Sequence, residues 1–362
     1  MAEITIRSVT SMDEWLSLSS AWSNLLAESN SSTLFLTWEW LYSWSEVCLE
    51  KDRQLFILAF YEKNSLVGVA PFYLQKRKFG LFPVREIRFL GTPESGSDYL
   101  DIVAKKGHEY EVSNALYDYL QGEGRSGWDQ LHLTDIRSES LFLLHFMNRL
   151  DEEGRYAELK RSAYCPGVQL PNSEEGLDSI LSSSWRKTFR RVERVSNRDY
   201  AVSFVVFAGA EVAAELETFF QLYEEKTGHA REPIYSIMKK MLEKSAEQMP
   251  FQIDHLLLDG KLVASLLSFK YGQTFSTYLI VVDKQFNPRI SLGGLLYGHN
   301  IKNAISSAFE YYDFLKGDER YKFHWANTGR CTLSLDLWQK SAAGYSLALA
   351  KLTRLIGKVL LR

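Results

Sequence analysis

Two segments of the chain share one pattern of apolar and polar positions. Residues 55–74 (LFILAFYEKNSLVGVAPFYL) and 253–272 (IDHLLLDGKLVASLLSFKYG) each contain an apolar run, a short polar break and a second apolar run. Lys63-Asn64 and Asp259-Gly260 occupy the breaks, and such residues favour the tight turn of a β-hairpin. The pattern therefore predicts one β-hairpin in each half of the chain.

The elements around the two hairpins follow the same order, which indicates an internal repeat. Before each hairpin the pattern predicts one strand and two helices. After it, a further strand leads into a helix (109–120 in the first half, 293–309 in the second) and a final strand (128–136 and 311–319). Each half thus reads β-α-α-β-β-β-α-β, a mixed sheet with a helix between its last two strands.

The length of 362 residues fits two domains of ordinary size, and a hydrophobic content of 46% allows each to bury a core. Periodicity is lost near residues 155–170, so we place the boundary there. We predict a first domain at 1–160 and a second at 161–338. The remainder, 339–362, contains no acidic residue and predicts a basic amphipathic helix.

Composition and charge exclude several classes of function. The net charge of −3 argues against a DNA-binding protein. The cysteines Cys48, Cys165 and Cys331 are odd in number and far apart, and no group of His, Cys and carboxylates has metal-ligand spacing. We therefore predict neither a disulfide framework nor a metal site. No signal peptide and no apolar run of the roughly 20 residues that span a bilayer are found, so we expect a cytoplasmic protein.

The final segment leaves two interpretations open. Residues 340–362 mix Lys and Arg with many Leu and Ala. Such a helix can lie in a membrane interface beside anionic lipids, which would place the protein at the inner face of the cell membrane. Docking of the helix against the protein itself is the alternative.

The segment 311–326 (YYDFLKGDERYKFHWA) joins an apolar strand to a dense set of ionisable groups. A transfer site needs a base that removes a proton from the attacking amine or hydroxyl, and Asp318 or Glu319 suits that role. It also needs a donor or cation at the developing oxyanion, for which Tyr321 and Lys322 are the candidates. A salt-bridged surface turn is the alternative interpretation.

Three segments resemble motifs of the CelD/BcsL-like acetyltransferases, a family related to the FemABX aminoacyltransferases. They are FLTWEWLYSW (35–44), LVGVAPFYL (66–74) and DFLKGDERYKFHW (313–325), and Lys316 in the third stands where Arg is usual. The resemblance covers nearly the whole chain. It implies two tandem α/β domains of the GNAT acyltransferase fold. The second would carry the donor site, and the first would be a degenerate copy that supports it and shapes an acceptor groove.

The resemblance also implies a site for acetyl-CoA or another acyl-CoA. In the GNAT fold the cofactor pairs with a splayed strand, and its pyrophosphate binds the unpaired N–H groups at the start of the next helix. The matching strand here is 274–283. The candidate cofactor-binding residues are Val281, Val282, Asp283, Arg289, Ser291, Gly293 and Gly294. Their spacing departs from the family pattern R/Q-x-x-G-x-G/A.

Further residues are predicted to bind the acceptor substrate or to take part in catalysis. Lys322 falls where FemABX-like enzymes have an active-site lysine. Glu225 and His229 end a helix beside the expected acceptor cleft, Tyr278 lies on the donor strand, and Trp325 closes the last motif. Core packing is the alternative role for Tyr278.

Residues 182–198 (SSSWRKTFRRVERVSNR) predict a strongly basic helix with Ser184 as its cap and an apolar stripe that begins at Trp185. Its basic face is either solvated or an anion site. The anion would be a CoA or nucleotide phosphate, a tRNA acceptor stem, or an acidic glycan or lipid.

These observations together predict an acyltransferase that moves an acetyl or acyl group from acyl-CoA to an amine or hydroxyl of an amino sugar or polysaccharide precursor. We expect direct attack, because no cysteine lies near the last motif to form a covalent intermediate. A FemABX-like transferase that uses aminoacyl-tRNA is one alternative. A non-catalytic component of an exopolysaccharide assembly system is the other, and the irregular phosphate loop favours it.

Overall fold

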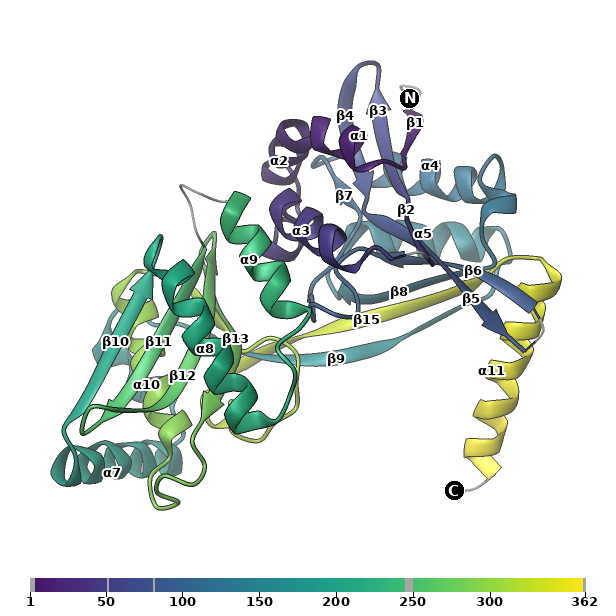
Figure 1. The fold of residues 1–362 in the computed structure, drawn as a ribbon. Helices are drawn as coiled ribbons and strands as arrows, with labels where there is room; N and C mark the ends of the chain where they lie inside the picture. Colours follow the sequence, from purple (N-terminus) through teal and green to yellow (C-terminus); the bar gives the residue numbers. More distant parts are fainter. Residues whose placement is uncertain (1–3, 51, 81, 245–249, 361–362) are drawn as a thin grey trace. The chain divides into compact units, whose positions relative to one another are not determined.

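The computed structural model describes residues 4–50, 52–80, 82–244 and 250–360. The chain forms two compact units, of which the first comprises Met1–Ser162 and Thr332–Arg362 and the second Ala163–Cys331. The backbone passes between them twice, within strand β9 (Ala157–Gln169) and within strand β15 (Thr328–Trp338) (Figure 1). The end of the chain therefore belongs to the first unit.

The second unit has the predicted order β-α-α-β-β-β-α-β. Its elements are β10 (Val202–Ala208), α8 (Glu211–Thr227), α9 (Ile234–Lys244), β11 (Phe251–Leu258), β12 (Lys261–Tyr271), β13 (Thr274–Val282), α10 (Leu292–Ser306) and β14 (Tyr311–Asp313). Three helical pieces precede them, namely η3 (Glu174–Gly176), α6 (Leu177–Ile180) and α7 (Ser183–Asp199). The strands lie in the order β10-β11-β12-β13-β14-β9, and β13 and β14 are parallel.

Local chemistry explains the turns of this sheet. Asp259 and Gly260 join β11 to β12 with φ values of 51° and 77°, so the predicted hairpin is confirmed. β14 is shorter than the strand predicted over 311–319. After it, Asp313 accepts a hydrogen bond from the amide of Leu315 at 2.7 Å, and such a local bond competes with strand pairing. Leu315 and Gly317 then adopt positive φ, which turns the chain.

β13 separates from β14 after three paired residues, Thr274–Ser276. On its other edge, β13 pairs Leu279 with Leu267 but Thr277 with Ser268, so Tyr278 is an extra residue. An extra residue of this kind increases the local twist of a strand. Among the residues that the structure describes, no strand therefore pairs with this edge of the second half of β13.

Helices cover both faces of this sheet. α8 packs against β10, β11 and β13, and α10 packs against β11, β12 and β13 from the opposite face (Figure 1). α7 lies against α10, and its apolar stripe contributes Phe189 to the core formed by α10 and the sheet. The cap of α7 is Ser182, which accepts a hydrogen bond from the amide of Trp185 at 3.2 Å, so the prediction of Ser184 was wrong. The serine three residues before the bonded amide has the spacing that a cap requires.

The first unit follows the same order with an insertion. Its elements are β1 (Ile4–Val9), α1 (Met12–Ser17), α2 (Ser19–Ala27), η1 (Leu34–Leu36), α3 (Trp38–Cys48), β2 (Arg53–Leu55), β3 (Ile57–Glu62), β4 (Ser65–Ala70), β5 (Phe72–Phe79), β6 (Phe82–Phe89), β7 (Val103–Ala104), α4 (Glu109–Gln121), η2 (Arg125–Gly127), β8 (Gln130–Arg137) and α5 (Leu141–Glu152). The predicted order omitted the inserted hairpin β5–β6. Its strands carry frequent charges and therefore lack a continuous apolar signal. One sheet has the order β1-β3-β4-β7, and β8, β6, β5 and β2 extend from β15.

The final helix, α11 (Ala342–Leu360), starts against the first unit. Leu347 joins Val84 and Trp338 in a buried cluster, and the Lys351 ammonium forms ion pairs with Asp336 and Glu158. This part of the predicted basic helix is thus docked on the protein, while residues 361–362 lie outside the described part. Over the described residues, no helix combines the length and apolarity needed to cross a membrane.

Candidate active site

A cavity of about 400 Å³ lies in the second unit at the start of α10. Its walls come from the start of α7, the end of α8, the second half of β13, the first turns of α10 and the turn after β14. The lining residues are Trp185, Lys226, Thr227, Ile280, Val282, Lys284, Ser291, Gly293, Gly294, Tyr297, Tyr321 and Trp325. The predicted residues Val282, Ser291, Gly293, Gly294, Tyr321 and Trp325 therefore meet at one place.

The start of α10 has the properties of an anion site. Ser291 caps the helix as predicted, with its Oγ accepting from the amide of Gly294 at 3.2 Å. The amides of Leu292 and Leu295 also have carbonyl acceptors, whereas the described residues provide none for the amide of Gly293. A free N–H group at the positive end of a helix attracts phosphate or another anion.

The facing wall is the unpaired part of β13. A Cβ placed on Gly293 would lie 3.8 Å from side-chain carbons of both Ile280 and Val282, so the helix start and the strand face each other closely. Val281 alternates to the other side of the strand and is buried in the core. The backbone edge of this strand can pair with the amides of an extended ligand, as an added strand would.

Aromatic residues form the end of the cavity nearest β14. The Trp185 and Trp325 rings meet edge to face with centroids 5.5 Å apart. The rings of Tyr297 and Tyr321 stack at 5.4 Å, and the Tyr297 hydroxyl donates to that of Tyr321 at 3.4 Å. Burial raises the pKa of both phenols, and the charge of Glu319 adds to the effect on Tyr321. Both hydroxyls therefore stay protonated at neutral pH and can act as hydrogen-bond donors.

Lys226 brings a positive charge to the cavity from the last turn of α8. Its Nζ lies 3.2 Å from Asp283 Oδ2 and 2.8 Å from Glu225 Oε1. Burial alone would raise the pKa of Asp283, but hydrogen bonds from Lys226 and from the amide of Gln285 lower it. Asp283 thus remains ionised and holds Lys226 in place, which gives this predicted cofactor residue a positioning role.

Lys322 is buried beneath the loop that follows β14. Its Nζ donates to the carbonyl oxygen of Lys316 at 2.8 Å and lies 3.0 Å from Glu319 Oε2. A Cβ on Gly317 would come within 2.5 Å of the same Nζ, so only a glycine leaves room for this contact. Lys322 therefore fixes the loop that carries Asp318 and Glu319. Both carboxylates are exposed, and neither lines the cavity.

Five predicted residues lie elsewhere in the second unit. Arg289 is exposed on the loop before α10, and Glu225 and His229 are exposed at the end of α8. Tyr278, the extra residue of β13, is half-buried, and its ring lies 5.8 Å from that of Phe269. Val281 is the buried residue noted above. None of the five lines the cavity.

The sequence did not single out six residues of the cavity. They are Trp185, Lys226, Thr227, Ile280, Lys284 and Tyr297. A signal existed for Tyr297, which lies four residues after Gly293 and so on the same face of the helix. Lys226 was adjacent to the chosen Glu225. For Trp185 no local signal existed, because its place depends on how α7 packs on α10.

A buried network of hydrogen bonds connects α10 to the sheet. Asn300 Nδ2 donates to Asp254 Oδ2 at 2.8 Å, and Gln252 Nε2 donates to the same oxygen at 2.9 Å. The Tyr312 hydroxyl donates to Asn300 Oδ1 at 2.6 Å. Burial raises the pKa of Asp254 to about 6, against the hydrogen bonds from Gln252 and Asn300 and the charge of Lys270. The network ties the helix to β11 and β14 through polar bonds within an otherwise apolar core.

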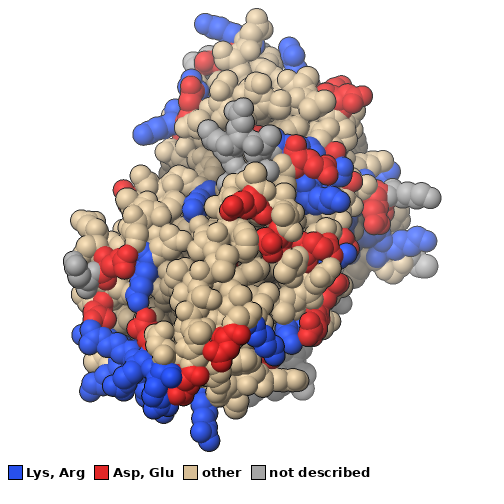
Figure 2. Space-filling view, turned by 60° about the vertical axis from the view of Figure 1, so that its left-hand side comes forward, with Lys and Arg blue, Asp and Glu red and all other residues tan. Residues whose placement is uncertain are grey.

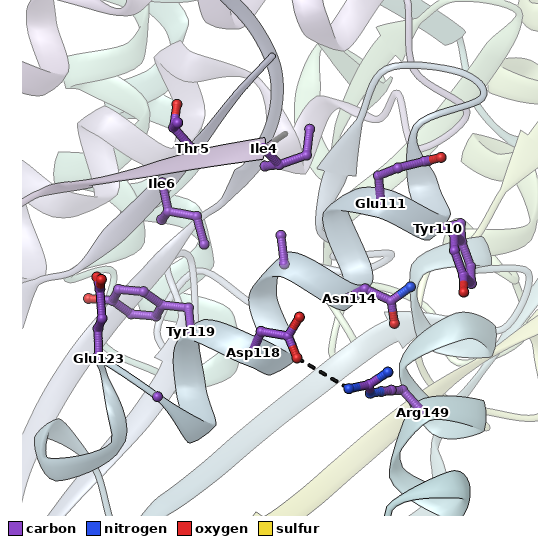
Figure 3. A pocket seen from close by; sticks show the side chains of 12 residues that line it. Ile4, Thr5, Ile6, Tyr110, Glu111, Asn114, Asp118, Tyr119, Glu123 and Arg149 are labelled. Atoms are coloured by element: carbon purple, nitrogen blue, oxygen red, sulfur yellow. Dashed lines mark hydrogen bonds and ion pairs between the residues drawn. The ribbon is translucent and has the colours of Figure 1, made fainter. Parts of the chain in front are cut away.

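The first unit has a larger cavity, of about 760 Å³, between β1, α4 and α5 (Figure 3). Glu111, Asp118 and Glu123 line it, and Arg149 pairs with Asp118 at 3.4 Å. The start of α4 carries acidic residues in its first turn and no side-chain cap. Negative charge along this helix disfavours a phosphate ligand. The cavity with the properties of an anion site is therefore that of the second unit.

The fold and this site define a class of protein. A mixed sheet whose parallel strands separate beside a helix start is the GNAT acyltransferase fold, and the second unit has it. Residues 183–323 match the family model described as acetyltransferase (GNAT) domain. The match extends from α7 to the turn that contains Lys322. In the described residues no group of His, Cys and carboxylates is arranged to hold a metal ion.

Solved structures extend the likeness over both units. FemX is similar with a TM-score of 0.57 and 11% identity, over 92% of this chain and 97% of that one. L-PGS from Bacillus licheniformis is similar with a TM-score of 0.52 and 15% identity, over 93% of this chain and 96% of that one. A tandem GNAT protein from the clavulanic acid biosynthesis pathway is similar with a TM-score of 0.50 and 11% identity, over 92% of this chain and 98% of that one. With TM-scores of 0.50 to 0.57 at such low identities, the likeness shows a shared fold and nothing more. The search of curated proteins found no match.

Proposed function

We propose that the second unit binds an acyl-CoA and transfers its acyl group, in the first instance acetyl, to an amine or hydroxyl of a small acceptor. The observation that carries this proposal is the cavity at the start of α10. A free amide at a capped helix start, an unpaired strand edge and an apolar wall meet there, within a GNAT acetyltransferase domain.

Each part of an acyl-CoA has a counterpart among the lining residues. The pyrophosphate would accept from the amide of Gly293 and face the ammonium groups of Lys226 and Lys284. The amide groups of the pantetheine chain would pair with the free edge of β13. The thioester would then lie near Tyr297 and Tyr321, at the aromatic end of the cavity.

The reaction would be a direct transfer. The acceptor nitrogen or oxygen attacks the thioester carbonyl carbon, the C–S bond breaks, and CoA leaves as a thiolate that takes up a proton. The Tyr321 hydroxyl is positioned to stabilise the oxyanion or to protonate the thiolate, because it reaches the cavity and stays protonated. Asp318 or Glu319 would accept the proton of the acceptor, and Lys322 would hold their loop.

The acceptor class is part of the same proposal. The resemblance of residues 313–325 to the CelD/BcsL-like acetyltransferases favours an amino sugar or a polysaccharide precursor. A donor of this kind and such a precursor meet in the cytoplasm, where we place the protein.

A second candidate is transfer from aminoacyl-tRNA, which the FemABX-like features imply. The basic side chains of α7 favour it, because they offer several contacts for a phosphate backbone. Dependence of the activity on added aminoacyl-tRNA, and its loss after ribonuclease treatment, would distinguish this candidate from an acyl-CoA transferase.

The test is thermal unfolding with and without millimolar CoA and acetyl-CoA. A ligand at about 100 times its dissociation constant stabilises a protein by about 2.7 kcal/mol, which is visible as a rise in melting temperature. Gly293→Leu should abolish the rise in melting temperature, because the new side chain would fill the space between the helix start and the side chains of Ile280 and Val282. Ser307→Leu, at the exposed far end of α10, should keep it. No rise in the natural protein would reject the acyl-CoA donor.

A further inference from the structure

The strand β10 forms one edge of the sheet in the second unit, where Figure 1 shows it as the outermost strand. It pairs with β11 in a register that runs without a shift from Val202 opposite Leu258 to Ala208 opposite Gln252. Over the part of the chain that the structure describes, no strand pairs with the other side of β10. This side is therefore a free sheet edge.

The backbone groups on the free edge belong to alternate residues of β10. The carbonyl oxygen of Ala201 accepts a hydrogen bond from the amide of Asp259 at 3.0 Å, and these two residues continue the register of β10 and β11. Successive residues of a strand direct their N–H and C=O groups to opposite sides, so every second residue after Ala201 faces away from β11. The residues that face away are Val202, Phe204, Val206 and Ala208. Their backbone groups are available to a further strand.

This edge lacks the features by which proteins protect an edge strand. Residues 202–208 (VSFVVFA) contain no charged residue and no proline, and Val205 and Val206 are 39% and 37% exposed. The equivalent edge strand of the first unit, β1, has Arg7 near its middle, with the guanidinium 4.9 Å from the ring centroid of Tyr61. An apolar edge without a charge, a proline or a bulge favours pairing with another strand.

Opposite charges flank the two ends of β10. The helix α7 leads into the start of the strand, and Figure 2 shows Lys and Arg side chains gathered where α7 lies, at the lower left of that view. Its exposed Arg194 and Arg198 lie nearest to β10 in the sequence, and Arg198 also pairs with Asp199. The helix α8 follows the end of the strand and begins with the exposed Glu211. The strand thus runs from a basic end to an acidic end.

We propose that β10 pairs with the β10 of a second copy of this chain, as antiparallel strands about a twofold axis at Val205. A twofold axis places the basic end of each strand beside the acidic end of the other, so the charges at both ends are complementary. In this register Phe204 lies opposite Val206 of the second copy, and Val202 lies opposite Ala208 of the second copy. Each of these pairs exchanges two hydrogen bonds, because the free backbone groups face each other.

The two Val205 side chains meet at the axis of this dimer. They lie directly opposite each other in a pair without hydrogen bonds, the kind in which side chains are closest. The exposed surface of Val205 and Val206 is then buried, and the two sheets become continuous. Residues 202–208 do not line the cavity at the start of α10, so the dimer is independent of the proposed donor.

Sedimentation equilibrium of the full chain measures the association. The pairing of two strand edges buries little surface, so we expect a weak dimer whose fraction increases as the protein concentration is raised to about 1 mM. Val206→Lys should remain monomeric, because a charge protects an edge strand. Val206→Pro should also remain monomeric, since it removes an N–H group that faces away from β11. Ser307→Lys, which adds the same charge at the exposed far end of α10, should keep the dimer.

A disulfide tests the position of the axis. The Cα atoms of the two Val205 residues would lie about 4.5 Å apart, within the range that a disulfide spans. Val205→Cys should therefore form a covalent dimer on oxidation with copper phenanthroline. Ser203→Cys should not, because the two copies of position 203 would lie about 13 Å apart along the strands. The natural protein, with its three cysteines, measures the background.

Three results would overturn the proposal. They are a natural protein that stays monomeric up to about 1 mM, a dimer that persists in both Val206 variants, and equal cross-linking of Val205→Cys and Ser203→Cys. A dimer that depends on Val206 and cross-links only through position 205 supports it. Because no residue of β10 lines the cavity, all of these variants should bind CoA as the natural protein does.

Discussion

The Nζ atom of Lys322 lies 2.8 Å from the carbonyl oxygen of Lys316 and 3.0 Å from Glu319 Oε2, with 6% of its side chain exposed. The partners of this ammonium group, the carbonyl of Lys316 and the carboxylate of Glu319, both belong to the loop that follows β14. It stabilises the turn that carries Asp318 and Glu319, so the segment 313–325 is held in shape by one of its own side chains.

We expect Lys322→Met to lower both stability and activity. The variant keeps the length of the side chain but leaves a buried carbonyl and a carboxylate unpaired, at a cost of about 2 kcal/mol in the free energy of unfolding. Transfer should fall by at least 10-fold because the loop loses its position. Urea unfolding and steady-state acetyl transfer would measure the two effects. Arg320→Ala, an exposed change in the same loop, should alter neither.

We expect Asp318→Ala to lower the transfer rate without lowering the stability of the protein. Its carboxylate is exposed, so the melting temperature should not change while the transfer rate falls by about 100-fold, as expected on loss of a general base. A variant with full activity would remove Asp318 from the proposed mechanism, and Glu319→Gln would then be the next variant to assay.

The two stacked tyrosines should respond differently to loss of their hydroxyl groups. Tyr321→Phe removes the hydroxyl nearer to solvent and should lower kcat by about 10- to 100-fold with little change in KM for the donor. Tyr297→Phe removes a buried hydroxyl that donates to Tyr321, and should lower kcat by less. Similar losses in both variants would argue against Tyr321 as the proton donor.

Glycines 293 and 298 of α10 should tolerate alanine to different degrees. At Gly298 a methyl group would overlap the Phe189 ring, and such overpacking costs about 1–3 kcal/mol. At Gly293 the nearest neighbours would be 3.8 Å away, so Gly293→Ala should fold with unchanged or higher stability. Chemical denaturation of both variants measures the difference. Equal stabilities would mean that α7 does not pack on α10 as described.

Asp254 should make the stability of the protein depend on pH. Its pKa of about 6 in the folded state exceeds the ordinary value of 3.8, so the folded state binds the proton more tightly. The resulting stability is complete below pH 4 and is lost as the pH rises through 6, by about 3 kcal/mol in all. Lys270 and His299 are the other titratable groups that face this carboxyl.

Asp254→Asn isolates this contribution, because an asparagine oxygen at the position of Oδ2 can still accept from Gln252 and Asn300. Relative to the natural protein, the variant should gain about 2 kcal/mol in free energy of unfolding between pH 4.5 and 7.5. Asp101 in the first unit also has a pKa of about 6 and is unchanged by the substitution, so it cancels in the comparison. Parallel pH profiles of the two proteins would contradict the prediction.

The fold of the second unit was largely readable from the sequence, because its signals are local. Asp259-Gly260 specifies a hairpin turn, and Ser291 before Gly294 specifies a helix start. The extra residue at Tyr278 was not readable. It arises from the register of β13 against β12, which depends on the packing of both strands rather than on any residue type.

The sequence marks only those residues of the candidate site that lie in segments with a local signal. Gly293, Gly294 and Tyr321 lie in segments whose composition marks them, and they do line the cavity. Trp185 and Lys226 come from helices more than 60 residues before the start of α10, and only tertiary packing brings them there. The burial of Lys322 likewise depends on the loop that folds over it.

The two passages of the backbone between the units have a consequence for biosynthesis. The second unit is a single stretch, Ala163–Cys331, whereas the first needs residues from both sides of that stretch. In particular, β8 pairs with β15 residues Thr332–Trp338, which leave the ribosome only after the whole second unit. The second unit can therefore fold during translation while the sheet of the first still lacks a strand. A chain that ended after Cys331 would contain the whole second unit, Ala163–Cys331, attached to a first unit that lacks its last strand.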